Sequence, residues 1–497
     1  DIDELTAQLE AELKECEATT VSYKNKLKQF MMENEIWQIS ELNYYWREKY
    51  CEYLKHRMSK TSCELYIKTF DRVKLHSLRK QPQIILAGKR QRPQYADEIL
   101  YLPYHPNIEI AERFCKENNK NLLAWDFTLK AAEKLKRQIF QVLHYFIENA
   151  ANSERMHAQL GGLARLYDFC VLEQIEDLEK LEIDQIERFQ KTFTTEYQRH
   201  YYAGVTYWCG RALFMEAEEI HWDANVWYME RMHLQPERMD PAAPVMSLSF
   251  AEVTNKENRK LLQKYLRYGI GISNLSISSL RTEFLVVRKF LGDMNQPETE
   301  NICMVTEQQM DAWLRSEQQR EVQADTFNKK VMCILHFFQY LQIKDYITVI
   351  PFEPNYYLKK TFMQHHDRSV AQETMDQIRR NLYRFPEEVR LMYLHLWGVG
   401  LRISEVCTLK GNAYYLQGKD AWIQVYQTKM RTYKRIPIPM TLYRLMQVYI
   451  TKYQRKAEEY IFQNRNGGAY RKTTFQQTMK RLCEESVSYT HLRAHET

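Results

Sequence analysis

Hydrophobic residues recur at spacings of three and four along most of the chain, which is the pattern of amphipathic helices. Two clear examples are LKRQIFQVLHYFIENA at 135–150 and SISSLRTEFLVVRKFLGDM at 276–294. The pattern changes near the end, where AWIQVYQTKMRTYKRIPIP at 421–439 alternates apolar and polar positions around a basic turn. Such alternation predicts a β-hairpin. We therefore expect a mainly α protein with a small β-hairpin sheet in its last part.

Proline-rich segments interrupt the helical pattern and predict domain boundaries or linkers. The first is QPQIILAGKRQRPQYADEILYLPYHPN at 81–107, and the second is QPERMDPAAPVMS at 235–247. From these breaks we predict four parts: a helical N-terminal segment at 1–90, a helical bundle at 120–235, a second bundle at 255–354 and a final domain at 367–486.

Two segments resemble each other. LARLYDFCVLEQIEDLEKLE at 163–182 and ILHFFQYLQIKDYITVIPFE at 334–353 each carry an aromatic helix end, then an Ile, an acidic residue and a short apolar run. Each also follows a longer amphipathic helix, so the pair indicates two copies of one small helical bundle. Shared helical periodicity is the alternative explanation, because it produces loose matches of the same kind.

Composition narrows the class of protein. Lys and Arg number 70 against 64 Asp and Glu, for a net charge of +6, which permits a nucleic-acid partner. The ten cysteines form no Cys-x-x-Cys pair and lie at no metal-binding spacing, so we expect reduced, buried thiols in a cytoplasmic protein without a metal site. No apolar run has the length of a membrane span, so we expect no membrane association.

An unusual segment is LWGVGLRISEVCTLKGN at 396–412, in which a single Arg402 stands at the start of an apolar, helix-like run. Burying an arginine is costly unless the guanidinium is paired. The position therefore calls for an anionic ligand or for a structural partner, and Glu405 one turn later can serve as that partner.

Three segments in order resemble the tyrosine recombinases, the family of phage integrases and bacterial site-specific recombinases. GVGLRISEVCTL at 398–409 resembles the box that carries the first catalytic arginine, and the hairpin at 425–439 resembles the one that carries the catalytic lysine. YIFQNRNGGAYRKTTFQQTMKRL at 460–482 is similar to the stretch that leads to the second box. The bundle at 255–354 resembles the family's SAM-like core-binding domain, and the final domain its mixed α/β catalytic domain.

The resemblance assigns roles to particular residues. Arg402 would bind the non-bridging phosphate oxygens in the transition state, Glu405 would brace it, and Lys429 would protonate the leaving 5′ oxygen. Lys429 has a plainer alternative, because basic hairpin turns are often just solvated. Four further basic residues would contact DNA phosphates: Arg368, Arg431, Lys434 and Arg435. For the neighbouring His365 and His366, phosphate contact and solvent exposure are both better explanations than metal binding.

The resemblance also implies a function: site-specific recombination of double-stranded DNA through a 3′-phosphotyrosyl intermediate. It implies no metal or organic cofactor, and self-association into a tetramer on paired sites. Two other functions stay open. The chain could be a DNA-binding accessory protein without catalysis, or a helical scaffold that binds protein and keeps a vestigial recombinase domain.

The last eleven residues, VSYTHLRAHET at 487–497, do not fit the family. A His-x-x-Arg box is expected, yet the residue three before Arg493 is Thr490, and His491 is only two before it. Back-translated, the segment resembles adapter DNA used to prepare sequencing libraries. We therefore predict a non-native tail in which Tyr489 is not the nucleophile, and a chain that binds DNA but does not cut it.

Overall fold

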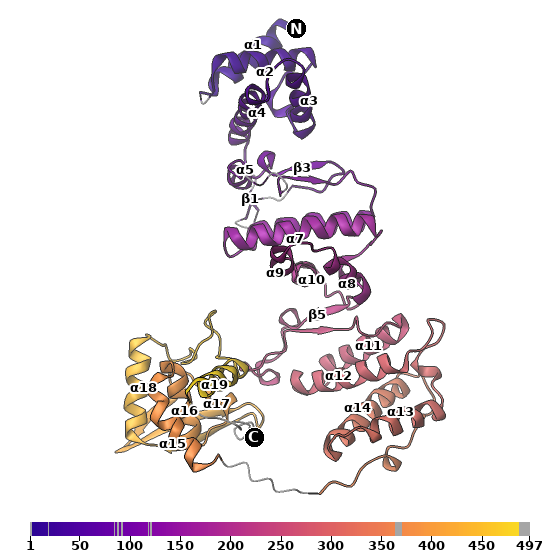
Figure 1. Cartoon of the computed structure of the whole chain (residues 1–497), viewed down its shortest axis with the longest axis vertical. Coiled ribbons are helices and arrows are strands. Elements are labelled where there is room, and N and C mark those ends of the chain that lie inside the picture. Colours follow the sequence, from indigo (N-terminus) through magenta and orange to yellow (C-terminus); the bar gives the residue numbers. More distant parts are fainter. Residues whose placement is uncertain are drawn as a thin grey trace. The chain divides into compact units, whose positions relative to one another are not determined.

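The computed structural model describes residues 2–17, 19–83, 85–86, 89–90, 93–117, 119, 122–362 and 370–486. The chain divides into two compact units, with the division between Asn225 and Val226. The described residues are mostly helical, and their strands form four small antiparallel sheets (Figure 1). The mainly α fold expected from the hydrophobic periodicity is confirmed.

The first unit begins with a four-helix module, which we call module 1 (residues 2–80). Its helices are α1 (Ile2–Glu15), α2 (Val21–Glu33), α3 (Tyr44–Lys55) and α4 (Lys60–Lys80), with the 3₁₀ turn Ile39–Glu41 between α2 and α3. Helix α2 packs against both α1 and α4. The apolar faces meet in a core that includes Leu9, Phe30, Tyr50 and Phe70.

The segment at 81–107, for which the sequence predicts a linker, contains regular structure. Its elements and their neighbours are β1 (Ile85–Leu86), β2 (Lys89–Arg90), β3 (Ile99–Tyr101), the 3₁₀ turn Leu102–Tyr104, α5 (Ile108–Phe114) and β4 (Ala124–Asp126). Strand β1 pairs with β2, and β3 pairs with β4. Because the partner of β3 lies more than twenty residues further along the chain, the local pattern gives no signal of this pairing.

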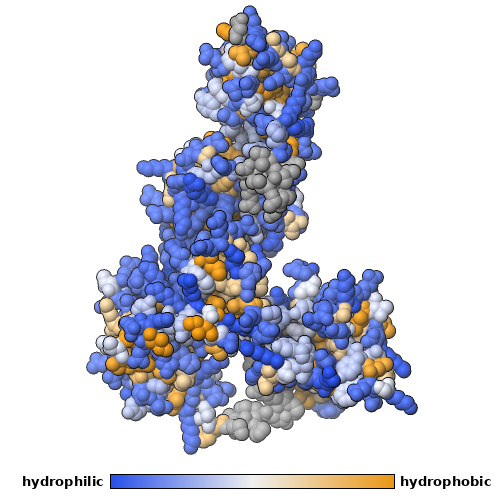
Figure 2. Space-filling view, turned by 180° about the vertical axis from the view of Figure 1, so that it is seen from behind, coloured by the Kyte–Doolittle hydropathy of each residue, from blue (hydrophilic) through white to orange (hydrophobic). Residues whose placement is uncertain are grey.

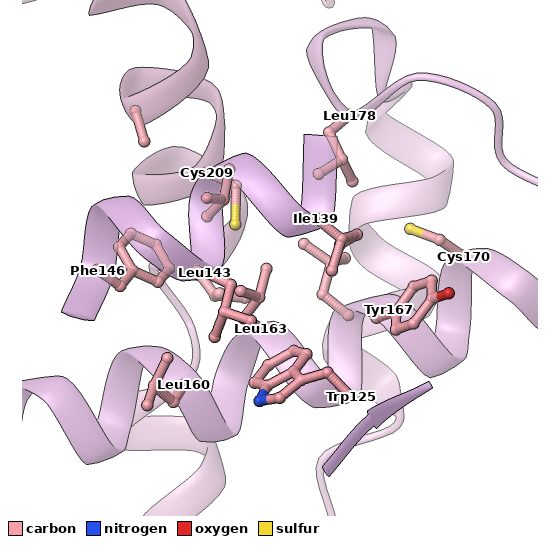
Figure 3. Close-up of a cluster of buried hydrophobic side chains, with 14 of the residues drawn as sticks. Trp125, Ile139, Leu143, Phe146, Leu160, Leu163, Tyr167, Cys170, Leu178 and Cys209 are labelled. Atoms are coloured by element: carbon pink, nitrogen blue, oxygen red, sulfur yellow. The ribbon is translucent and has the colours of Figure 1, made fainter. Parts of the chain in front are cut away.

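A second helical module (module 2, residues 133–216) completes the first unit. Its elements are α6 (Glu133–Asn149), α7 (Ser153–Leu172), the 3₁₀ turn Leu178–Lys180, α8 (Ile183–Lys191), α9 (Glu196–Tyr201) and α10 (Val205–Glu216). Figure 3 shows its core, where Leu143 and Phe146 of α6 meet Leu163 of α7 and Cys209 of α10. Trp125 of β4 belongs to the same core, so the preceding sheet is part of this fold.

The second unit opens with β5 (Val226–Tyr228), the 3₁₀ turns Met229–Met232 and Pro236–Arg238, and β6 (Ser247–Ser249), which pairs with β5. Module 3 (residues 256–343) follows, with α11 (Lys256–Ile272), α12 (Ile277–Met294), the 3₁₀ turn Ile302–Met304, α13 (Glu307–Gln319) and α14 (Ala324–Ile343). The 3₁₀ turn Pro354–Tyr356 comes after it.

The same order of elements recurs in all three modules: two helices, a residue with positive φ, a 3₁₀ turn, and further helices. The positive-φ residue is Glu35, Gln174 or Asn295. In each module the second helix packs against the first and against the last. The sequence comparison matched α7 with α14, whereas the order of elements makes α12 the counterpart of α7. The two comparisons differ because α7 and α14 share a local feature. Each is followed by a residue with positive φ and then by an apolar run, and these residues are Gln174 after α7 and Asp345 after α14.

The final part of the chain forms a C-terminal domain (residues 370–486). Its elements are α15 (Gln372–Asn381), the 3₁₀ turn Leu382–Arg384, α16 (Glu387–Val399), α17 (Ile403–Cys407), β7 (Tyr414–Gln417), β8 (Asp420–Gln427), β9 (Thr432–Ile438), α18 (Met440–Lys452) and α19 (Lys472–Ser486). The sheet order is β7-β8-β9. The predicted hairpin is β8 and β9, and β7 is a third strand that the sequence analysis missed.

The predicted linker at 235–247 packs against the folded parts of the second unit. Ala242 is buried in the core of the C-terminal domain, and its carbonyl oxygen accepts a hydrogen bond of 3.1 Å from the backbone N–H of Lys472. Arg238, also buried, donates to the carbonyl oxygens of Ile270 at 2.8 Å and Leu275 at 2.9 Å. This segment therefore contacts both module 3 and the C-terminal domain.

All ten cysteines are free thiols. Eight of them are buried as expected, whereas Cys115, which follows the last residue of α5, is exposed, and Cys303 in the 3₁₀ turn Ile302–Met304 is partly exposed. In the part of the chain that the structure describes, no helix has both the length and the apolar character required to cross a bilayer.

Candidate functional site

The position of Arg402 is fixed by the turn between α16 and α17. Helix α16 is followed by its C-cap residue Gly400, whose φ of 71° lies in the left-handed region, and the N–H of Gly400 donates to the carbonyl of His395. Glycine takes this conformation without the steric cost that a Cβ brings. The chain then turns into α17 with Arg402 as its N-cap residue. The side chain of Arg402 is 56% exposed, so the guanidinium faces solvent at the start of a short helix.

Glu405 is the centre of the site. Its side chain is only 3% exposed, and it accepts hydrogen bonds from the backbone N–H of Arg402 at 2.9 Å and from Arg402 Nη1 at 3.3 Å. Lys434 Nζ donates to Glu405 Oε2 at 2.9 Å, and Gln427 Nε2 donates to Oε1 at 3.1 Å. One buried carboxylate thus joins the first turn of α17 to both strands of the hairpin.

The charge state of Glu405 follows from these contacts. Burial by itself raises the pKa of the carboxyl, because the charged form loses its hydration. The hydrogen bonds from the Arg402 backbone, Lys434 and Gln427 outweigh burial and hold the pKa of Glu405 below its ordinary value. The carboxylate is therefore ionised at neutral pH, which suits a group that orients two cations.

Strand register brings Lys434 and Gln427 to the same carboxylate. Lys434 pairs with Val425 and Gln427 pairs with Thr432 in the β8–β9 ladder. The sequence analysis missed Gln427 as a site residue. The signal was available in the alternation of the strand, since Val425 and Gln427 point to one face two residues apart.

The hairpin turn carries Lys429 and Arg431. Lys429 is exposed, and the described residues offer it no ion-pair partner. Arg431 has a φ of 53°, and its Nη2 donates to the carbonyl of Asn274 in the α11–α12 connection at 2.5 Å. The turn is therefore anchored at Arg431 while Lys429 stays free to reach a ligand.

The other predicted DNA contacts do not form one surface. Lys434 is engaged with Glu405, and Arg435, its neighbour in β9, is exposed on the opposite face of the strand. Arg368, His365 and His366 lie outside the described residues. Of the predicted site residues, the structure brings together Arg402, Glu405 and Lys434, and places Lys429 and Arg431 on the adjoining turn.

A cavity of about 650 Å³ lies beside the hairpin. Its walls come from the segment Pro236 to Pro241, from Glu405 and Thr408, and from Thr428 and Arg431 of the hairpin. Arg402 does not line it. With Glu405 and Glu458 among its lining residues, this cavity is a poor site for a phosphate, and the exposed side of Arg402 is the better one.

The arrangement suits the binding of an oxyanion at Arg402. Guanidinium groups carry five N–H donors in a planar fork, and Glu405 uses only one edge of this fork. The remaining donors have no partner among the described residues, while the buried carboxylate keeps the group in one orientation. A fixed, permanently charged donor of this kind stabilises negative charge without having to reorganise.

Residues 368–497 match the family model described as the phage integrase family. This matched stretch makes up about a quarter of the chain and includes the C-terminal domain. The match includes residues 487–497, whose predicted non-native origin it does not test.

The chain is also similar to curated proteins from Staphylococcus aureus. It is 22% identical over 280 residues to transposase B from transposon PsiTn554, a match that covers 55% of this chain and 44% of that protein. Over 286 residues it is 22% identical to transposase B from transposon Tn554, with the same coverage. The chain thus spans less than half the length of these relatives.

Among solved structures, two similar ones are recombinases bound to DNA. The XerH site-specific recombinase bound to its difH substrate is 14% identical with a TM-score of 0.36, and the match covers 50% of this chain and 77% of that one. The Tn1549 transposon integrase in complex with circular intermediate DNA is 15% identical with a TM-score of 0.34, covering 48% and 83%.

Proposed function

We propose that this chain is the DNA-binding and partial catalytic region of a transposon-type tyrosine recombinase that acts on double-stranded DNA. The observation that carries the proposal is the set of contacts around Glu405, which holds an exposed Arg402 beside the hairpin of Lys429. The match of residues 368–497 to the phage integrase family model and the similarity to transposase B support it.

In this function each residue has a defined task. A tyrosine hydroxyl attacks the scissile phosphodiester, so that a phosphotyrosyl bond forms as the bond to the 5′ oxygen breaks. Arg402 binds non-bridging oxygens while their negative charge increases, and Glu405 orients it. Lys429 donates a proton to the departing 5′ oxygen. Rejoining runs through the same steps in reverse with the other strand's 5′ hydroxyl.

Lys434 takes a different task from the one that the sequence suggests. Its ammonium is bound to Glu405 and is 27% exposed, so it holds β9 against α17. Arg431 and Arg435 remain the hairpin's candidates for phosphate contact, together with Arg368 outside the described residues. Four protomers on two paired sites are the assembly that this reaction requires.

The test begins with binding of the chain to duplex DNA as a function of salt. We expect affinity to fall steeply with salt, because phosphate contacts release counterions. Binding that is absent, or insensitive to salt, would favour a protein-binding scaffold instead.

The second step recovers the native reading frame beyond residue 486 and expresses the protein that it encodes. If that frame encodes a His-x-x-Arg box and a tyrosine, the protein should form a covalent DNA adduct on a denaturing gel with duplexes from the element's ends. Arg402→Ala should abolish the adduct while most DNA binding persists. A frame without the tyrosine would leave a DNA-binding accessory protein.

A further inference from the structure

Module 1 has the connection order of module 3, the bundle whose sequence resembles a core-binding domain. The charges of the two are arranged differently, however. Helix α11 of module 3 carries five basic residues and one acidic residue, whereas α1 of module 1 carries five acidic residues and one lysine. A contact between module 1 and a polyanion therefore cannot use α1, and must use another side of the module.

Such a side exists around Tyr53 at the end of α3. The Cζ atom of Arg57 lies 3.9 Å from the centroid of the Tyr53 ring, and Lys26 Nζ of α2 lies 5.3 Å from it. Lys55 ends α3 and Lys60 begins α4, so both flank the short connection that contains Arg57. We call these five residues the Tyr53 surface.

The four cations of the Tyr53 surface are not neutralised. Within the described part of the chain none of them has a carboxylate at ion-pair distance, although Glu64 lies one turn after Lys60 on α4. Other cations of module 1 are paired, as Lys28 is with Glu10 and Arg47 with Asp71. Arg57 and Lys26 share one ring, Lys55 and Lys60 flank Arg57 along the chain, and the repulsion between such unpaired like charges is relieved by a polyanionic partner.

The geometry favours a phosphate backbone as the partner. Arg57 rests on the ring of Tyr53, and this contact fixes its planar guanidinium at the surface before a ligand arrives. A pre-oriented guanidinium flanked by flexible lysines matches phosphates that repeat along a nucleic-acid strand.

In the view of Figure 2, hydrophilic residues cover most of the visible surface of the molecule, with only small hydrophobic areas between them.

We propose that the Tyr53 surface is a second DNA contact of this chain, one that binds the phosphate backbone of duplex DNA without reading bases. The inference rests on the proposed function, because the duplex is the one that the C-terminal domain acts on. Its role is to add affinity and to extend the length of DNA that one protomer covers.

The experiment measures the affinity of the whole chain for a long duplex of mixed sequence across a series of salt concentrations. We compare the wild type with the triple variant Lys55→Gln, Arg57→Gln and Lys60→Gln. If these residues contact phosphates, the slope of log K against log salt should shrink by about 2 to 3, with weaker binding at low salt.

A matched control removes the same net charge elsewhere on the first unit, by Lys116→Gln, Lys130→Gln and Lys191→Gln, which change three exposed lysines. We expect this control to keep the wild-type slope. The conservative variant Arg57→Lys should also keep most of the slope. Thermal melting of each variant separates loss of contact from loss of fold, because all the substituted positions are exposed.

The outcomes are distinct. A triple variant with the slope and affinity of the control would overturn the proposal and leave the surface to an acidic protein partner, while salt-dependent binding by the wild type would still support the proposed function. A wild-type chain that does not bind duplex DNA would count against the proposed function itself.

Discussion

Lys434 Nζ lies 2.9 Å from Glu405 Oε2, and this ion pair attaches the second strand of the hairpin to the helix that begins at Arg402. The carboxylate is nearly inaccessible, with an exposed fraction of 3%, while Arg402 on its other side is 56% exposed. The contact therefore serves two purposes. It stabilises the C-terminal domain, and it leaves Arg402 as the more exposed of the two cations that Glu405 binds.

The first prediction concerns Glu405→Gln. The amide keeps the shape of the side chain, but it leaves Lys434 without a counter-ion in a partly buried position. Removing one partner of such a pair is strongly destabilising, so we expect the free energy of unfolding to fall by about 2–4 kcal/mol. Urea denaturation measures it. The control is Glu458→Gln, which changes an exposed carboxylate of the same domain and should alter stability by less than about 0.5 kcal/mol.

The second prediction separates Lys434 from Arg402. Lys434→Met leaves the buried carboxylate short of a donor and should cost about 1–3 kcal/mol of stability. Arg402→Met should change the free energy of unfolding by less than about 1 kcal/mol, because an exposed guanidinium contributes little to stability. The backbone N–H of residue 402 still donates its hydrogen bond to the Glu405 carboxylate. In DNA binding the order should reverse, with the larger loss in Arg402→Met. Equal losses of stability in the two variants would contradict the assignment of Lys434 to structure and of Arg402 to ligand binding.

The third prediction tests the turn that places Arg402. Gly400 has a φ of 71°, so Gly400→Ala adds a Cβ in a conformation that L residues rarely adopt and should destabilise the domain by about 1 kcal/mol. Gly398 offers a matched control two residues earlier, inside α16, where an added Cβ meets no atom within 4 Å. Gly398→Ala should be neutral, or stabilising by up to about 1 kcal/mol. Thermal melting compares the two.

The fourth prediction is a pH dependence set by His395. This residue is fully buried, its Nδ1–H donates to the carbonyl of Leu391, and its Nε2 accepts from the Tyr414 hydroxyl at 2.6 Å. Burial lowers the pKa of His395 from 6.5 to about 4. Since the unfolded chain binds the proton first, stability is lost as pH falls from about 6.5 towards 4, by about 2 kcal/mol between pH 7 and pH 5.

The measurement for His395 is urea unfolding of the wild type and of His395→Gln at pH 7 and pH 5. We expect His395→Gln to be less stable than the wild type at pH 7. Its free energy of unfolding should then fall by about 2 kcal/mol less than that of the wild type between pH 7 and pH 5. The other buried histidines are present in both proteins, so their contribution cancels in the comparison. Parallel declines would show that His395 is already charged in the folded protein, or that it is not buried.

Local patterns predicted those features that depend on neighbours in sequence. The helices of the C-terminal domain and the β8–β9 hairpin follow from periodicity, and the ion pair between Arg402 and Glu405 follows from their placement one turn apart. Strand β7 and the pairing of β3 with β4 were missed, because short strands draw their stability from distant partners. The catalytic roles of Arg402 and Lys429 stay predictions.

The sequence alone predicted the class of fold, the long helices, the β8–β9 hairpin and the residues from which a phosphate site can be built, since these depend on spacing and side-chain chemistry. The tertiary structure decided which of those residues meet. Lys434 and Arg435 are adjacent in sequence and both basic, yet β9 turns one towards the buried carboxylate of Glu405 and the other to the opposite face. That choice depends on the register of β8 with β9 and on the burial of Glu405, which only the packed fold establishes.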